Sequence, residues 1–161
     1  MSRAQRPDSQ VVQGQLDEFL RYALRSICTL LAGEDAGGTL WLRDGPGDFH
    51  RIHLALLNGV VSSGTEAGYG CECIPLAPCE LPRSGAPRCC SGYGADRWIS
   101  RGLRGFVSLP MMVADRQIGC FIAHLKPADA DPPPSAIELA EFMARLATQA
   151  LDIGGRRSRE S

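Results

Sequence analysis

The sequence lacks a long apolar run, an apolar leader and an excess of charge of one sign. Its longest apolar stretch, at 106–114, contains Ser108 and Pro110 and is far shorter than the roughly 18 residues that span a bilayer. Residues 1–20 are polar, which argues against a secretory leader. Lysine and arginine (17) nearly balance aspartate and glutamate (18), so the chain lacks the basic surface of a general nucleic-acid binder. We therefore expect a cytoplasmic protein that binds neither membranes nor nucleic acid.

What the sequence contains is the ordinary balance of a folded domain. Of its 161 residues, 44% are apolar and 22% are charged, and this length corresponds to about one domain. Both ends are more polar than the middle. We expect a flexible lead-in over residues 1–14, a single domain over 15–153 and a disordered tail over 154–161.

The first helix is predicted by an apolar period that begins at Leu16 and continues to Leu31. Its expected buried stripe consists of Leu16, Phe19, Leu20, Ala23, Leu24, Ile27, Leu30 and Leu31. Cys28 lies beside this stripe and is interpreted as a core residue. Gly33 is expected to end the helix, because glycine tolerates the left-handed conformation found there.

The second helix follows three prolines at 132–134. Ser135 and Glu138 have the spacing of a capping box, which predicts the helix start. The expected buried stripe consists of Leu139, Phe142, Met143, Leu146, Ala147 and Ala150. Gly154 and Gly155 are expected to end the helix.

Between the helices the apolar period falls towards two, which is typical of strands. The segments 39–43 and 49–58 are predicted to form one hairpin, and 105–113 and 117–125 another. In 117–125, Phe121 and its alternate neighbours share one face, while Cys120, Ile122 and His124 share the other. His50 and His53 lie in the first hairpin, which we expect to be half-exposed. The segment 62–94 has the composition of a loop.

Residues 102–111 (GLRGFVSLPM) followed by 115–121 (DRQIGCF) resemble the GAF sensory domain family. The family pattern is a Gly-hydrophobic-Arg-Ser strand ending in a Leu/Val-Pro step, then a turn and an Ile-Gly strand; here Gly105 stands where serine is common. Segments 74–76, 84–87 and 95–96 are also similar to the family's central loop. The resemblance implies an α+β fold with an antiparallel sheet of five or six strands, both terminal helices packed on one face, and a loop-covered pocket on the other.

The resemblance also implies a homodimer formed through the terminal helices, and a small-molecule ligand. Candidate pocket residues are Tyr93, Trp98, Cys120 and His124, with packing in the core as the alternative for each. Cys120 and His124 are about 13 Å apart along one strand, too far to bind one metal together. The sequence lacks the cyclic-nucleotide signature of the family, and none of its seven cysteines is followed by the histidine typical of bilin-binding branches.

Five of the seven cysteines gather in a short stretch of the central loop: Cys71, Cys73, Cys79, Cys89 and Cys90. Their spacing matches neither the usual paired zinc knuckles nor a common iron–sulfur run. Three interpretations remain open. The cysteines bind zinc or an iron–sulfur cluster, they sense redox state by disulfide exchange, or they are buried as small apolar residues.

We therefore expect a non-catalytic sensory or regulatory domain that binds a small ligand or senses redox state or metal through this loop. Its signal would pass to a separate output protein, unless the chain is a piece of a longer system. One alternative is an enzyme similar to a stand-alone branch of the family that reduces free methionine sulfoxide with thiols, with Cys79, Cys89 and Cys120 as candidates. The other is a structural dimerisation module.

Overall fold

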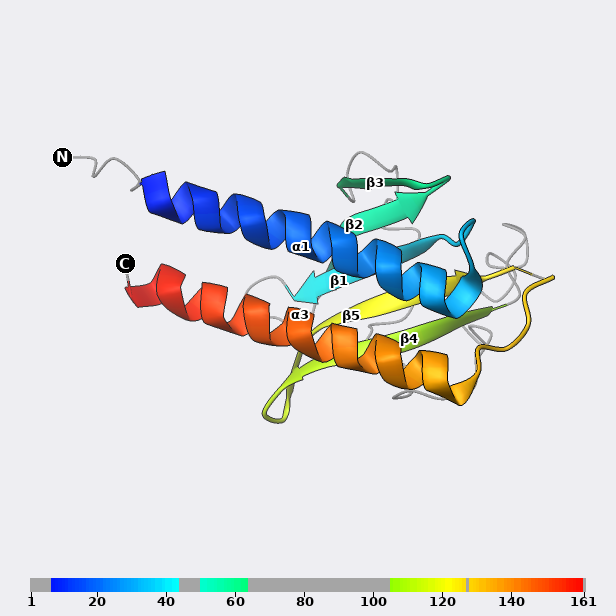
Figure 1. The fold of residues 1–161 in the computed structure, drawn as a ribbon. Helices are drawn as coiled ribbons and strands as arrows, with labels where there is room; N and C mark the ends of the chain where they lie inside the picture. Colours follow the sequence, from blue (N-terminus) through cyan, green and yellow to red (C-terminus); the bar gives the residue numbers. More distant parts are fainter. Residues whose placement is uncertain (1–6, 44–49, 64–104, 127, 161) are drawn as a thin grey trace.

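The computed structural model describes residues 7–43, 50–63, 105–126 and 128–160. In chain order, its elements are α1 (Pro7–Ala32), β1 (Gly38–Arg43), β2 (His50–Leu57), β3 (Val60–Ser63), β4 (Gly105–Val113), β5 (Arg116–Leu125) and α3 (Pro134–Glu160). Figure 1 shows the two long helices side by side in front of the sheet. In the described residues, no helix is long and apolar enough to span a membrane.

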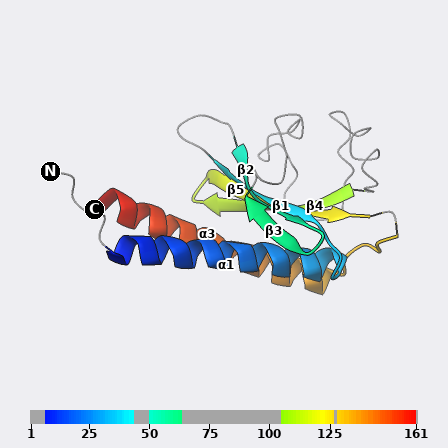
Figure 2. The same ribbon diagram turned by 90° about the horizontal axis from the view of Figure 1, so that it is seen from above.

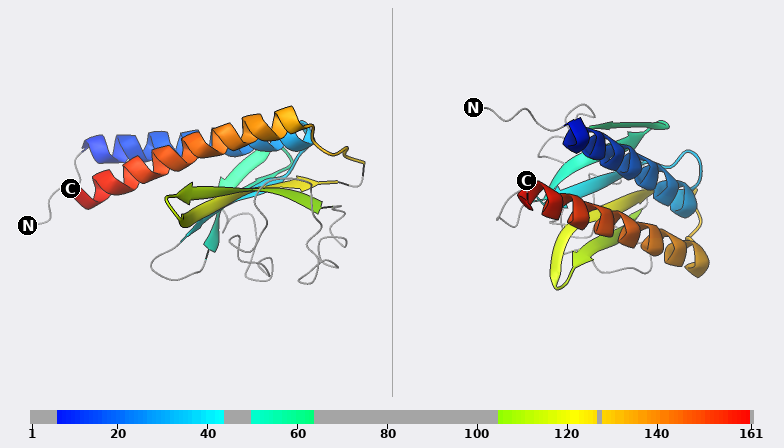
Figure 3. Two further views of the ribbon diagram at one scale, coloured as in Figure 1. Left: turned by 90° about the horizontal axis from the view of Figure 1, so that it is seen from below. Right: turned by 60° about the vertical axis from the view of Figure 1, so that its left-hand side comes forward.

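The described strands form one five-stranded sheet in the order β3-β2-β1-β5-β4, and every neighbouring pair is antiparallel. The views from above and from below show α1 and α3 as one layer on a single face of this sheet (Figures 2 and 3). The predicted α+β fold and the predicted placement of the helices are confirmed. The two strand pairs expected from the sequence are also present, as β1–β2 and β4–β5.

Strand β3 was not expected from the sequence, where its last two residues fall in the predicted loop. The chain reverses between β2 and β3 at Asn58 and Gly59, which have positive φ angles of 50° and 78°. Positive φ at both central residues is the geometry of a type I′ turn, which Asn-Gly favours. The missed signal was therefore Asn58-Gly59 between the apolar pairs 56–57 and 60–61.

Both helices are longer than the sequence analysis expected. Helix α1 starts at Pro7, inside the segment expected to be a flexible lead-in and well before Leu16, and proline suits the first helical position. Helix α3 continues through Gly154 and Gly155 to Glu160, so the expected stop at these glycines is wrong. A Cβ atom on Gly154 would lie 3.2 Å from the Leu16 Cδ2 atom, so glycine allows α1 to approach closely here. Beyond the sheet, the two extensions run side by side (Figure 1).

The predicted capping box at the start of α3 is also wrong. Helix α3 begins at Pro134, one residue before Ser135, and the Pro133 carbonyl accepts hydrogen bonds from the Ala136 and Ile137 amides at 3.0 and 3.2 Å. Pro134 therefore occupies the first helical position, and its missing N–H removes a donor that would have had no helical acceptor.

The buried stripe of α1 largely agrees with the prediction. Its fully buried members are Leu20, Ala23, Leu24, Ile27, Cys28 and Leu31, which confirms Cys28 as a core residue. They pack against one face of the sheet and against α3 in a continuous apolar cluster. Phe19 departs from the prediction, because 36% of it is exposed.

The buried stripe of α3 differs from the prediction. Leu139, Phe142 and Leu146 are 48%, 51% and 41% exposed, whereas Ala140, Ala144 and Ala147 are buried against α1 and the sheet. Helix α3 thus carries two apolar stripes on roughly opposite sides, a small-residue stripe inside and a large-residue stripe outside. The apolar period locates such stripes but does not say which one faces the core. The small side chains of the inner stripe let α3 pack closely against α1 and β4.

Candidate ligand-binding face

The sheet face opposite α1 and α3, called the far face below, has a different composition from the helix-covered face. Phe121, Ala123 and Leu125 of β5 pack in the cluster with the helices. Because successive strand side chains alternate, Cys120, Ile122 and His124 point to the far face. Cys120 and Ile122 form a second buried cluster with Trp41 and Phe106, and Ile52 packs against it.

The strand register aligns these far-face residues in rows that cross the sheet. In one row Thr39 of β1 pairs with Ala55 and with Ile122, which in turn pairs with Ser108. In the next row Trp41 pairs with Ile52 and with Cys120, which pairs with Pro110. Three of the four side chains in the first row are thus small, and the second row contains the larger Trp41 and Ile52.

Polar side chains are buried among these apolar residues. Of the four buried polar side chains in the described part of the chain, three lie on the far face: Thr39, Ser108 and His124. The Trp41 Nε1–H donates to the Thr39 Oγ1 at 2.8 Å. The fourth, Thr148, donates to the Ala144 carbonyl within α3 at 2.7 Å. Buried polar groups are normally hydrogen-bonded, as Thr39 is to Trp41, and three of the four gather on one face of the sheet.

His124 lies where β5 runs past the segment before β1. Its backbone N–H donates to the Gly37 carbonyl at 2.9 Å. A Cβ atom on Gly37 would lie 3.6 Å from the His124 Nδ1 atom and 3.2 Å from the Leu56 carbonyl oxygen. Because glycine has no side chain, the backbone at position 37 can approach the His124 imidazole and the Leu56 carbonyl closely.

A family model for the GAF domain matches residues 15–151, most of the chain. The chain belongs to the GAF domain family. This membership confirms the resemblance drawn from the β4 and β5 sequence. No curated protein matches the chain.

Two solved GAF domains resemble this one in fold. The first is the GAF3 domain of a Synechocystis protein in its photoproduct state, with 12% identity, a TM-score of 0.64, and coverage of 93% of this chain and 99% of the other. The second is the blue-light absorbing form of the PixJ GAF domain of Thermosynechococcus elongatus, with 12% identity, a TM-score of 0.52 and coverage of 89% and 92%. At this identity the likeness concerns the fold alone.

Two of the predicted pocket residues of this GAF domain, Cys120 and His124, lie on the far face and are buried. The Cys120 Sγ–H donates to the Phe121 carbonyl at 3.4 Å, and burial raises the pKa of this thiol to about 12. A thiol with so high a pKa has almost no thiolate at neutral pH and is a poor nucleophile. The other predicted residues lie outside the described residues: Tyr93, Trp98, Cys71, Cys73, Cys79, Cys89 and Cys90.

Within the described ranges, no group of three or more His, Cys, Asp or Glu side chains is arranged to hold a metal ion. Cys28, the other described cysteine, is buried on the helix side, and burial raises its pKa to about 12 as well. The zinc, iron–sulfur and disulfide-exchange interpretations of the cysteine-rich segment remain predictions from the sequence.

Thr39, Trp41, Phe106 and Ser108 were missed as site residues in the sequence analysis. The alternation of 39–43 and 105–109 already indicates that Thr39 and Trp41 share one face and that Phe106 and Ser108 share one face. The sequence alone does not say that both pairs belong to the same side of one sheet. That fact depends on the long-range pairing of β1 with β5, which puts Trp41 beside Cys120.

Proposed function

We propose that this GAF domain is a non-catalytic sensory module that binds a small molecule against the far face of its sheet. The observation that carries the proposal is the set of three buried polar side chains, Thr39, Ser108 and His124, among Trp41 and other large apolar residues. Ligand sites are typically apolar surfaces with a few placed polar groups.

The chemistry of the far face favours a ligand whose buried part is uncharged. Among the described residues, none of the buried side chains is Asp, Glu, Lys or Arg. An ionised group placed there would lose its hydration without a charged partner, which is strongly unfavourable. Trp41 and Phe106 favour a flat, partly aromatic ligand, and the hydroxyl groups of Thr39 and Ser108 favour one with a hydrogen-bonding edge.

The methionine sulfoxide reductase alternative is weakened for Cys120. Reduction of a sulfoxide by thiols starts from a thiolate, and the raised pKa of Cys120 opposes its formation. Cys79 and Cys89, the other candidates, lie outside the described residues. Redox or metal sensing through the cysteine-rich segment is likewise a proposal from sequence. The sequence gives no support for pigment attachment at a Cys-His pair, since none of its cysteines is followed directly by a histidine.

We also propose that the domain forms a homodimer through α1 and α3, and that ligand binding changes the helix layer that reaches a separate output protein. The outer side of the helix layer carries large exposed apolar residues, namely Val11, Phe19, Tyr22, Leu139, Phe142, Leu146 and Ile153. On each helix they lie opposite the buried stripe. A surface of this kind on two adjacent helices supports a helix-to-helix interface, where aromatic and aliphatic anchors supply most of the binding energy.

Ligand binding is tested by screening a library of uncharged aromatic fragments against the isotope-labelled protein by NMR. Ser108→Ala removes a far-face hydroxyl, and Thr148→Val removes a buried hydroxyl from α3 as a matched control. We expect Ser108→Ala to weaken the fragments that bind and Thr148→Val to leave their affinity unchanged. Equal affinity for wild type and both variants, with no shift changes on β1, β4 or β5, would contradict the proposal.

The homodimer is tested by sedimentation equilibrium. Phe142→Glu places a charge in the exposed stripe of α3, and Ala130→Glu adds the same charge at an exposed position outside both helices. We expect wild type and Ala130→Glu to be dimers and Phe142→Glu to be a monomer with unchanged circular dichroism. A monomeric wild type, or a dimer that survives Phe142→Glu and Leu146→Glu together, would remove this part of the proposal.

A further inference from the structure

Two buried threonines of this domain use their hydroxyl groups in opposite ways. The Thr148 Oγ1–H donates to the Ala144 carbonyl within α3 at 2.7 Å, so the proton of this hydroxyl is bound. The Thr39 Oγ1 atom instead accepts the Trp41 Nε1–H at 2.8 Å, and these two residues are 3% and 4% exposed. Because an indole N–H can only donate, the proton of the Thr39 hydroxyl takes no part in this bond. Thr39 therefore keeps a buried hydrogen-bond donor on the far face.

The side chains beside Thr39 in the sheet offer this donor no acceptor. Its cross-strand neighbours are Ala55 of β2 and Ile122 of β5, and both are apolar. Within the described residues, the Thr39 hydroxyl makes no hydrogen bond besides the one from Trp41. A buried donor without an acceptor is unfavourable, and an acceptor atom of a bound ligand would remove this cost.

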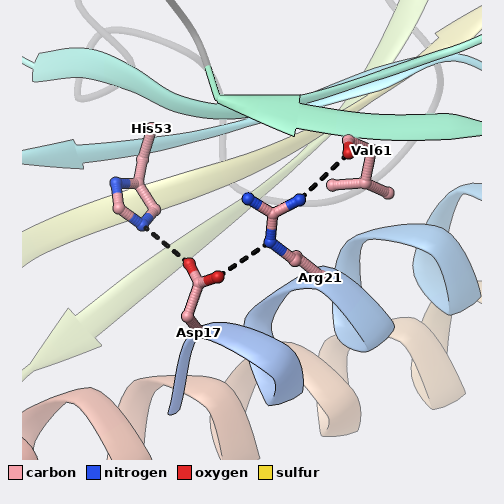
Figure 4. Close-up of polar contacts among 4 residues, drawn as sticks. All are labelled: Asp17, Arg21, His53 and Val61. Atoms are coloured by element: carbon pink, nitrogen blue, oxygen red, sulfur yellow. Dashed lines mark hydrogen bonds and ion pairs between the residues drawn. The ribbon is translucent and has the colours of Figure 1, made fainter. Parts of the chain in front are cut away.

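The polar group between α1 and the β2–β3 hairpin differs from Thr39, because its members bind one another and are accessible to water (Figure 4). The Arg21 guanidinium group donates to the Asp17 Oδ2 atom at 2.8 Å and to the Val61 carbonyl at 3.0 Å. The His53 Nε2 atom lies 3.9 Å from the Asp17 Oδ1 atom. The side chains of Asp17, Arg21 and His53 are 38–43% exposed. This group is complete without a ligand, whereas the donor of Thr39 is buried and lacks such partners.

The bond from Trp41 makes Thr39 a better donor than acceptor for a ligand. Hydrogen bonds in a chain polarise one another, so a hydroxyl that accepts one N–H donates its own proton more strongly. A second N–H on the same oxygen would bring two positively polarised hydrogens together, which is less favourable. Because Trp41 turns the N–H edge of its indole to Thr39, a flat ligand that lies against this ring brings its own edge near the hydroxyl. The favoured ligand therefore carries an acceptor at its edge.

We propose that Thr39, oriented by Trp41, determines ligand specificity on the far face: its hydroxyl donates to a hydrogen-bond acceptor, a ring nitrogen or a carbonyl oxygen, at the edge of a flat and uncharged ligand. The inference rests on the proposed function, because it concerns the ligand bound against this face. It adds a direction to the hydrogen bond. A ring with an acceptor at its edge is preferred to a similar ring with an N–H donor there. Trp41 acts through Thr39 and is a positioning residue.

The test compares three bicyclic probes of similar size at neutral pH. Quinoline has a ring nitrogen that accepts a hydrogen bond, indole has a ring N–H that donates one, and benzothiophene has no strong donor or acceptor. NMR titration of the full chain measures the three dissociation constants. In wild type, we expect quinoline to bind about three- to ten-fold more tightly than indole or benzothiophene, the range that one net hydrogen bond produces.

Two valine variants form a matched pair, because each removes one buried threonine hydroxyl and keeps the shape of the side chain. Thr39→Val should weaken quinoline to the affinity of benzothiophene, whereas Thr148→Val should leave all three affinities unchanged. Thr39→Ser restores the hydroxyl and should keep the preference for quinoline; it is also the second variant in case Thr39→Val does not fold. Trp41→Phe removes the N–H that Thr39 accepts, so the preference for quinoline over indole should narrow.

The outcomes separate this inference from the proposed function. Loss of the quinoline preference in Thr39→Val, with its retention in Thr39→Ser and Thr148→Val, supports the inference. Equal affinity of wild type for the three probes, or a quinoline preference that survives Thr39→Val, overturns the role of Thr39 and leaves ligand binding on the far face in place. Binding of none of the three probes to wild type overturns both.

Discussion

Both faces of the sheet carry buried side chains, but the two faces differ in their side-chain composition. The helix-covered face packs aliphatic and aromatic side chains against Leu24, Ile27 and the alanines of α3, and of the four buried polar side chains among the described residues one, Thr148, belongs to the helix layer. The far face places Thr39, Ser108 and His124 among Trp41 and its neighbours. Apolar packing is what stabilises a fold. The first face therefore supplies most of the apolar packing, and under the proposed function the polar groups of the second face serve recognition of the ligand.

Thiol reactivity tests how well each face is shielded from water, because each face carries one buried cysteine, Cys28 on the helix side and Cys120 on the far side. The pKa of Cys28 and that of Cys120 are each raised to about 12, so the thiolate fraction of either is lowered about a thousandfold at pH 8. We expect neither to react with iodoacetamide in the native protein at pH 8, and both to react after unfolding, as read by peptide mass spectrometry. Rapid alkylation of Cys120 alone would mean that the far face is open to water.

The second test uses neighbouring residues of β4 that point to opposite faces. Leu109→Ala on the helix side should reduce the free energy of unfolding by about 2–5 kcal/mol, because it leaves a cavity in the main cluster. Ser108→Ala on the far face should change it by about 1 kcal/mol. Urea denaturation measures both values. Similar losses for the two variants would contradict the division of labour between the faces.

The third test concerns the close approach of β1 to its surroundings. A Cβ atom on Gly38 would collide with the Cys28 Sγ atom and lie 2.5 Å from the Ile122 carbonyl oxygen. Gly38→Ala should therefore destabilise the protein by about 1–3 kcal/mol. The matched control is Gly14→Ala in α1, where nothing lies within 4 Å of the added atom. This control should stabilise the protein by about 0.5–1 kcal/mol. An unchanged free energy of unfolding in Gly38→Ala would show that β1 packs less tightly against Cys28 and Ile122 than these distances indicate.

The smallest effect is expected on the outer stripe of α3. In the monomeric background of Phe142→Glu, Leu146→Ala should change the free energy of unfolding by less than about 0.5 kcal/mol, because Leu146 is exposed. Ala144→Leu in the same background should destabilise by about 1–3 kcal/mol, because Ala144 is buried beside α1. Thermal unfolding measures both. A large loss of stability in Leu146→Ala would mean that Leu146 is buried, as the sequence analysis expected.

Local patterns in the sequence predicted most of the fold. The period of α1 located Leu20, Leu24 and Ile27 in the core, and alternation located both main hairpins. The prediction failed where a pattern has two solutions. In α3 the large and the small apolar residues both form stripes, and the proximity of α1 selects the alanines. Gly154 was expected to stop α3, yet contact with Leu16 makes glycine useful there.

The candidate site was less predictable because it is made by long-range pairing. Cys120 and His124 were found from one strand, but Thr39 and Trp41 join them only through the pairing of β1 with β5. His53 was expected in a half-exposed hairpin, and its link to Asp17 depends on a bulge that no local pattern in β2 announces. Residues far apart in the sequence thus define the far face and the contact between His53 and Asp17.

The central claim is that a small molecule binds against the far face, and Trp41 can report on it directly. The chain has two tryptophans, so Trp98→Phe leaves Trp41 as the sole tryptophan. We predict that titrating the tightest-binding uncharged aromatic fragment into this variant changes the Trp41 emission with the same dissociation constant that NMR measures. Saturable binding by NMR with unchanged Trp41 emission, and with shift changes confined to the outer side of α1 and α3, would contradict the claim.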